Sequence, residues 1–150
     1  ANGFFAIGSE LNTYINNTGV SENKSGFRFR ESYNNTVIGG TYTGGERGID
    51  FWGSQNNTFY NVTMSGNDAD IYGNFRTIDS TNLVINSTYN ESKIDMNGGS
   101  NVTLAKYVRI NVTSSGNPVS GAVVVGNDIF GIERFTDTSD GNGLTGNLEG

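Results

Sequence analysis

Residues 26–37 read Gly-Phe-Arg-Phe-Arg-Glu-Ser-Tyr-Asn-Asn-Thr-Val, and residues 48–59 read Gly-Ile-Asp-Phe-Trp-Gly-Ser-Gln-Asn-Asn-Thr-Phe. The second stretch repeats the first after 22 residues, with the same leading glycine, alternating apolar positions and Asn-Asn-Thr run before an apolar residue. Two copies at a fixed period are the sequence sign of a repeat architecture. We therefore interpret the flanking sequence as further turns of one coil.

Looser copies precede and follow this pair. The first coil begins at Gly3, and the fourth and fifth open at Asp70 and Lys93. The apolar residue that ends the motif recurs with spacings of 22, 25 and 20, at Val37, Phe59, Val84 and Leu104. Length differences of this size belong in corner loops. The sequence therefore predicts about five coils over residues 1–106.

Each coil is expected to consist of short strands. Phe27 and Phe29 alternate with Arg28 and Arg30, and a period of two ended by Gly, Asn or Ser is typical of a strand. No stretch carries a sustained helical apolar stripe. Short strands at this period favour a parallel solenoid, since propeller blades are about 40 residues long.

A parallel solenoid places equivalent residues above one another, about 4.8 Å apart. The alignment predicts three inward apolar ladders: Phe4, Phe27, Ile49, Ile71, Ile94; Ala6, Phe29, Phe51, Gly73, Met96; and Tyr14, Val37, Phe59, Val84, Leu104. It also predicts a corner ladder of hydrogen-bonded amides from Asn12, Asn35 and Asn57. On the outer face, Arg28 is expected to form a weak surface ion pair with Asp50.

The pattern Gly-Ile-x-[Leu/Phe]-x-x-Ser-x-Asn-Asn-Thr-[Val/Ile/Phe] resembles the right-handed parallel β-helix repeat over residues 3–106. That family includes pectate-lyase-like enzymes, phage tailspikes, the periplasmic copper-binding NosD type and many archaeal and bacterial cell-surface proteins. The resemblance implies an all-β fold, and it is specific for fold and not for function.

From Tyr107 the pattern changes to strands at about 10-residue spacing, which suggests a small β-sandwich. We expect strands over 107–113, 119–125, 129–136 and 144–148. Residues 116–124 and 136–143 resemble the carboxypeptidase-regulatory, Ig-like modules of surface proteins. Such a module usually has seven strands. Residues 107–150 are therefore expected to form a sandwich that is truncated or completed by another chain.

Composition excludes several kinds of function. The net charge of -6 and the pI of about 4.4 argue against a general nucleic-acid binder, which needs a basic face. The absence of Cys and His removes thiolate metal sites and the commonest metal ligand and general base. No run approaches the roughly 20 apolar residues of a membrane span. The chain begins Ala-Asn-Gly, which favours a processed or excised fragment.

Sequons of the form Asn-x-Ser/Thr occur nine times, whereas composition alone gives about four. N-glycosylation requires an exposed position in a secreted chain. The alternative is that Asn-Asn-Thr is only the corner of the repeat. We predict N-glycans at several of the nine: Asn16, Asn23, Asn34, Asn56, Asn61, Asn86, Asn90, Asn101 and Asn111.

Carboxylates offer two candidate groups, Asp68 with Asp70 and Asp79, and Asp50 with Asp95. Polysaccharide lyases and glycosidases of this fold use tight carboxylate groupings, which this sequence does not repeat. We therefore predict no catalytic residues and no enzymatic activity.

Asp137, Asp140 and Asn142 resemble a calcium loop, but Glu149 stands at position 13 and not 12, so a plain hairpin turn is favoured. Two methionines without His or Cys are too few for copper. No metal or cofactor is predicted.

Four aromatic residues fall at outward positions, namely Phe5, Trp52, Tyr60 and Tyr72. Exposed aromatic side chains could stack on sugars or bury against another subunit, and partial burial under corner loops is the alternative.

These patterns predict an extracellular or cell-surface structural protein. An N-glycosylated solenoid would self-assemble into a surface layer, sheath or filament as a homo-oligomer, through end-to-end or strand-donating contacts. The alternative is a carbohydrate-binding or polysaccharide-lyase-like β-helix domain.

Overall fold

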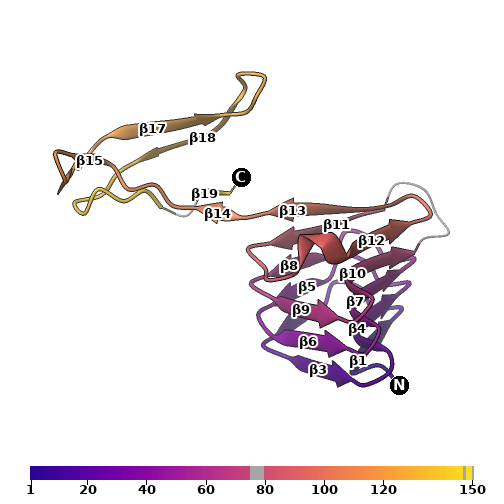
Figure 1. The fold of residues 1–150 in the computed structure, drawn as a ribbon. Coiled ribbons are helices and arrows are strands. Elements are labelled where there is room, and N and C mark those ends of the chain that lie inside the picture. The colour runs from indigo at the N-terminus through magenta and orange to yellow at the C-terminus, as the bar shows by residue number, and fades with distance from the viewer. Residues whose placement is uncertain (75–79, 147, 150) are drawn as a thin grey trace. The chain divides into compact units, whose positions relative to one another are not determined.

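The computed structural model describes residues 1–74, 80–146 and 148–149. The chain is all-β and divides into two compact units, Ala1–Leu104 and Ala105–Gly150. The first unit is a parallel β-solenoid of about four turns (Figure 1). The predicted fold class is confirmed.

The first sheet of the solenoid has five parallel strands in the order β1-β4-β7-β10-β12. Their bounds are β1 (Phe4–Ile7), β4 (Ser25–Arg30), β7 (Arg47–Trp52), β10 (Ala69–Asn74) and β12 (Ile94–Asn97). The register aligns Phe4 to Ile94 in one inward ladder and Ala6 to Met96 in another. Both predicted ladders are confirmed in full.

The second sheet also has five strands, in the order β13-β11-β8-β5-β2. Their bounds are β2 (Thr13–Ile15), β5 (Thr36–Ile38), β8 (Thr58–Tyr60), β11 (Ser80–Ile85) and β13 (Ser100–Ala105). The third ladder is confirmed from Tyr14 to Val84. It is wrong at Leu104, which is exposed, because Ser100 and Val102 take the inward positions of β13 and Val102 packs against the core.

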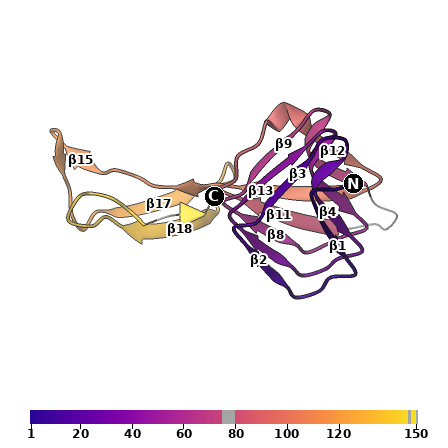
Figure 2. The same cartoon turned by 90° about the horizontal axis from the view of Figure 1, so that it is seen from below.

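The third sheet has only three strands, β3 (Thr18–Ser21), β6 (Thr41–Gly44) and β9 (Thr63–Gly66). In the fourth coil a short 3-10 helix, η1 (Glu91–Lys93), follows Asn90, whose side chain accepts a hydrogen bond from the Ser92 amide. The solenoid has about four turns, where the sequence predicts about five coils. Figure 2 shows the three sheets around a common interior.

Aromatic rings fill that interior. Phe27 stacks on Phe29 with ring centroids 4.2 Å apart. Phe59, from the opposite sheet, meets Phe29 and Phe51 edge-on at 5.5 and 5.3 Å. All four side chains are buried, and edge-on pairs add stabilisation beyond their buried area.

The predicted amide ladder is confirmed and is one member longer than expected. The Asn35 side chain donates to Asn57 Oδ1 at 2.9 Å, and the Asn57 side chain donates to Asn82 Oδ1 at 3.0 Å. Asn12 continues the ladder at the other end, where its backbone N–H donates to Asn35 Oδ1 at 3.0 Å. Asn35, Asn57 and Asn82 are buried, so these amides pair groups that would otherwise lack partners.

Corner residues repeat in the left-handed region of backbone conformation. At the second corner, between the second and third sheets, φ is 52° at Asn16, 54° at Asn61 and 47° at Asn86, and Gly39 takes the equivalent place. At the first corner, φ is 55° at Asn34 and 57° at Asn56. Asn adopts this conformation more readily than most residues, which accounts for its use at these corners.

The described part of the second unit contains three two-stranded antiparallel sheets, so the predicted sandwich, truncated or completed by another chain, stays a prediction. Their strands are β14 (Tyr107–Val108) with β19 (Leu148–Glu149), β15 (Thr113–Ser114) with β16 (Asn117–Pro118), and β17 (Val123–Asn127) with β18 (Glu133–Thr138).

The hairpin β17–β18 differs from the expected strand bounds because its loop closes on Asp128. Asp128 Oδ1 accepts hydrogen bonds from the backbone of Phe130 and Ile132, at 2.8 and 3.0 Å. Asp128 Oδ2 accepts two more from the Arg134 guanidinium, at 3.0 and 2.6 Å. Residues 128–132 are thus a turn, and β18 begins at Glu133, not at residue 129.

Candidate functional site

The outer face of the first sheet gathers the charged and aromatic side chains that alternate with the core. The register forms two outward rows: Phe5, Arg28, Asp50, Tyr72, Asp95; and Ile7, Arg30, Trp52, Asn74, Asn97. We call these ten residues the outer face. Their alignment follows from the period-two alternation repeated once per coil.

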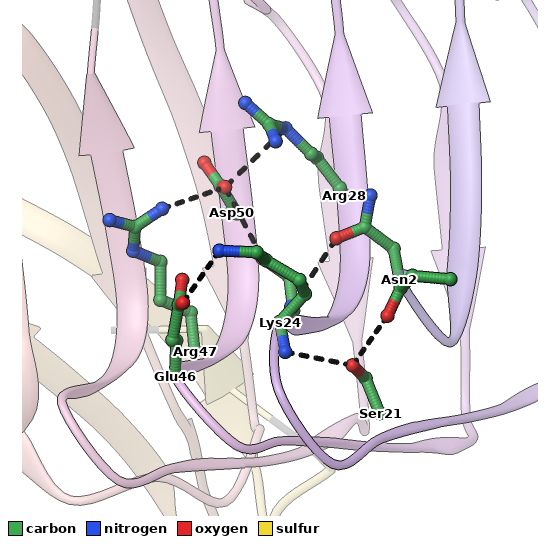
Figure 3. Close-up of polar contacts among 9 residues, drawn as sticks. Asn2, Ser21, Lys24, Arg28, Glu46, Arg47 and Asp50 are labelled. Atoms are coloured by element: carbon green, nitrogen blue, oxygen red, sulfur yellow. Dashed lines mark hydrogen bonds and ion pairs between the residues drawn. The ribbon is translucent and has the colours of Figure 1, made fainter.

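Asp50 is the centre of this face, and its side chain is fully buried. Its Oδ2 accepts hydrogen bonds from Arg47 Nη1 at 3.1 Å and from Ser25 Oγ at 3.2 Å, and it lies 3.5 Å from Arg28 Nε (Figure 3). The prediction of a weak surface pair is therefore wrong. Arg47, at the start of β7, folds over Asp50 and removes it from water together with Arg28.

Both guanidinium groups also stack on aromatic rings. The Arg28 guanidinium carbon lies 4.7 Å from the Trp52 ring centroid, and that of Arg47 lies 3.7 Å from the Tyr72 centroid. Arg30 is the strand partner of Trp52, and its guanidinium carbon lies 6.0 Å from the same ring centroid. Cation–π contacts of this kind hold Arg side chains flat against a surface. The result is a platform of guanidinium and aromatic planes, with Trp52 and Tyr72 half-buried.

Two buried polar atoms of this site have no hydrogen-bond partner, Arg28 Nε and Asp50 Oδ1. Arg28 Nε makes only the 3.5 Å ion pair with Asp50 Oδ2, while Asp50 Oδ2 itself accepts the two hydrogen bonds from Arg47 and Ser25. A buried donor and a buried acceptor without hydrogen bonds each cost free energy.

A network of hydrogen bonds fixes the corner that leads into β4. Lys24 Nζ donates to Glu46 Oε1 at 2.7 Å, and this bond lowers the pKa of Glu46 (Figure 3). Ser21 Oγ donates to the Ala1 carbonyl at 2.7 Å and accepts from the Lys24 amide at 2.9 Å. Asn2 Oδ1 accepts from the amide of Ser25 at 3.3 Å, and the hydroxyl of the same serine contacts Asp50.

Burial raises the pKa of Asp50, although the positive charges of Arg28 and Arg47 oppose the shift. The folded state therefore binds this proton more tightly than the unfolded chain. The contribution of the group to stability is present below its ordinary pKa and is lost as the pH rises through the raised value.

We expect Asp50→Asn to flatten the pH dependence of stability above about pH 4. The amide keeps an oxygen that accepts from Arg47 and Ser25 but cannot ionise. The measurement is urea denaturation across the acid range, with Asp95→Asn, an exposed carboxylate of the same face, as the control. Identical slopes for wild type and Asp50→Asn would contradict the assignment.

Among the described residues, the candidate carboxylates do not assemble into a site. Asp70 is buried and accepts hydrogen bonds from the backbone of Gly66 and Asn90, at 2.9 and 2.7 Å, so it serves the corner. Asp68 is exposed, and Asp79 lies outside the described residues. Tyr72 separates Asp50 from Asp95 in their row. Within the described residues, no three Asp or Glu side chains gather as metal ligands would.

The candidate calcium loop has the geometry of a turn. Asp140 Oδ1 accepts from the backbone of Asn142 and Leu144, at 2.8 and 2.9 Å, and these bonds lower the pKa of Asp140. Asp137 Oδ2 accepts from the Gly146 amide at 2.7 Å. The carboxylates are thus used by their own backbone, as in the hairpin turn that the sequence favours.

All nine sequon asparagines are exposed. Among the described residues the buried asparagines are Asn35, Asn57 and Asn82, and none of these begins a sequon.

The four outward aromatic residues differ in exposure: Phe5 is exposed, while Trp52, Tyr60 and Tyr72 are half-buried.

Sequence reasoning missed Arg47 and Asn82. Asn82 stands two residues before Val84, at the same spacing as Asn35 before Val37, so the ladder alignment contained the signal. Arg47 precedes the alternating part of β7, and nothing in the alternation indicates that its side chain reaches back over Asp50.

Comparison with protein-family models, curated proteins and solved structures finds no match to this chain. The class of protein is therefore defined by the fold alone, as a parallel β-solenoid with an aromatic core and an amide ladder.

No pocket lies among the described residues, and none of their helices is long and apolar enough to span a membrane.

Proposed function

We propose that this protein is an extracellular structural glycoprotein that self-assembles at a cell surface. The observation that carries the proposal is that all nine sequon asparagines are exposed, whereas the buried asparagines of the described residues, Asn35, Asn57 and Asn82, begin no sequon. A glycan needs a side chain that projects into solvent, and all nine sequons provide one.

Corner geometry does not account for all nine sequons. Five of their asparagines adopt a positive φ, which favours Asn for conformational reasons. The other four lie outside that set, namely Asn23, Asn90, Asn101 and Asn111. Asn90 caps η1, so three sequons have neither reason. The total of nine sequons, against about four from composition alone, supports glycosylation as the further reason.

Self-assembly is supported by the hairpin β17–β18. Among the described residues, no strand other than β18 pairs with β17, whose sequence begins with three valines and contains no charge. Val123 and Val125 are exposed on one face. An uncharged edge strand without proline readily pairs with another strand, and a second copy supplies an identical edge.

We expect Val125→Lys to weaken self-association of the chain by about tenfold or more, since a charge on an edge strand opposes edge pairing. The measurement is sedimentation equilibrium over a range of concentrations. Thr136→Lys is the matched control, because Thr136 is exposed and lies directly opposite Val125 on β18. A wild-type chain that stays monomeric would remove this support.

The proposal as a whole is tested by electron microscopy and intact mass of the secreted protein. The expected result is ordered filaments or sheets, with a mass above 16.1 kDa by multiples of sugar units. Isolated, unmodified monomers would overturn it and would favour the second candidate below.

That second candidate is carbohydrate binding, favoured by the stacked planes of the outer face. Aromatic rings and arginines on a flat sheet suit sugar rings and their polar substituents. Trp52→Ala is expected to abolish retention on polysaccharide gels, and Tyr60→Ala, a half-buried aromatic of another sheet, is the control. Release of unsaturated products from pectin or alginate would extend the function to cleavage.

A further inference from the structure

We propose that sequons on neighbouring coils exclude one another, so that a folded chain carries at most one N-glycan in the pair Asn34/Asn56 and at most one in the pair Asn61/Asn86. The inference rests on the proposed glycosylation. Because each of the two pairs loses one site, at most seven of the nine sequons are occupied on one molecule.

The pair Asn61/Asn86 stands on consecutive coils at the second corner. The Asn61 amide donates to the Ile85 carbonyl at 3.1 Å, which places Asn61 beside Asn86. The Asn86 side chain then donates from Nδ2 to Asn61 Oδ1 at 2.7 Å. Both residues have the same left-handed backbone, and the hydrogen bond shows that their side chains lie side by side.

The pair Asn34/Asn56 repeats this arrangement at the first corner. The Asn34 amide donates to the Gln55 carbonyl at 3.2 Å, and φ is 55° and 57° at the two asparagines. Neighbouring parallel strands are about 4.8 Å apart, which sets the distance between equivalent side chains of consecutive coils. Each pair therefore presents two acceptor nitrogens separated by about one strand spacing.

Transfer of a glycan needs a free nitrogen and space beyond it. Asn Nδ2 attacks the anomeric carbon of a lipid-linked sugar donor, the N–C bond forms, the lipid phosphate leaves with the bonding electrons, and Nδ2 loses one proton. A pyranose with its substituents is wider than one strand spacing. A branched glycan on one coil therefore fills the space in front of its neighbour.

The hydrogen bond between Asn61 and Asn86 determines which of the two asparagines receives the glycan. Asn86 Nδ2, the atom that would be glycosylated, is the donor to Asn61, whereas Asn61 contributes its oxygen. Asn61 is therefore the expected glycan carrier of that pair. Asn86 becomes the carrier only when Asn61 is not glycosylated.

Asn16 provides an internal comparison at the same corner. Its neighbour on the next coil is Gly39, and a Cβ atom there would overlap the Asn16 amide oxygen. With no side chain on the adjacent coil, Asn16 has no competitor at one strand spacing. Its occupancy is expected to be independent of Asn61.

The test is site-resolved mass spectrometry of the whole chain secreted from a eukaryotic host. The fractional occupancies within each pair are expected to sum to no more than one. Thr63→Val removes the Asn61 sequon but keeps the Asn61 amide, and it is expected to raise Asn86 occupancy by about twofold or more. Thr18→Val, the matched control, removes the Asn16 sequon and is expected to leave Asn61 unchanged.

Two results would overturn the inference: a pair whose occupancies sum to more than one, or an Asn86 occupancy that Thr63→Val does not change. Absence of glycan from all nine sequons is a different result. It would remove the proposed glycosylation itself.

Discussion

Replacing Asn57 with alanine is expected to lower the free energy of unfolding by about 4 kcal/mol, because it leaves several buried groups without partners. Asn57 Nδ2 donates to the Ser32 carbonyl and to Asn82 Oδ1, both at 3.0 Å. Asn57 Oδ1 accepts from the Asn35 backbone and side chain, at 3.0 and 2.9 Å. The measurement is denaturant unfolding followed by circular dichroism.

Asn12→Ala is the matched control for that ladder. Asn12 occupies the equivalent corner of the first coil but is exposed, so water can replace its partners, and a loss of no more than about 1 kcal/mol is expected. Asn57→Asp is a second variant of nearly the same shape, which cannot donate to Ser32 or Asn82. A loss of similar size for Asn12→Ala and Asn57→Ala would show that burial of the ladder does not matter.

Phe59→Ala is expected to destabilise the solenoid by about 3–5 kcal/mol through lost burial and the cavity that remains. Phe59 is fully buried, and its ring bridges the two large sheets by edge-on contacts with Phe29 and Phe51. The same unfolding experiment measures the effect. Phe5→Ala, on the outer face, is the control and is expected to cost less than about 1 kcal/mol, since Phe5 is exposed. A cost for Phe59→Ala as small as that for Phe5→Ala would contradict the assignment of the core.

Most of the solenoid could be predicted because the sequence has two periods, the two-residue alternation within strands and the 22-residue repeat between coils. Alternation of apolar residues sets the inward face of each strand, and the 22-residue spacing sets which residues align. Two of the three apolar ladders are confirmed over five strands for this reason. The amide ladder follows from the same alignment.

The sequence prediction and the structure differ where a local contact changes which residues face inward or where a strand begins. Ser100 is buried in β13 and Val102 packs against the core, so Val102 and not Leu104 continues the core. Asp128 closes a turn with its side chain and delays β18. In the fourth coil, Thr88 makes an isolated bridge to Thr63, and η1 follows after its cap Asn90. Each depends on one side chain bonding to nearby backbone, which a periodic alignment does not represent.

The candidate site could be predicted only in part. The alternation places Arg28 and Asp50 side by side on the outer face, as the register confirms. The burial of Asp50 depends on Arg47, whose direction is set by its stacking on Tyr72 and by its bond to Asp50. A surface pair and a buried one have the same sequence signature here.

The parallel register has a consequence for the behaviour of the chain under mechanical load. Strand partners are close in sequence, 22 residues apart for Phe27 with Ile49 and 25 for Phe59 with Val84, so each coil is bonded to its immediate neighbours. Tension along the chain would detach one coil at a time, and each 22-residue coil would release about 75 Å of extended chain. Such stepwise extension would absorb a sudden pull without exposing the whole aromatic interior at once.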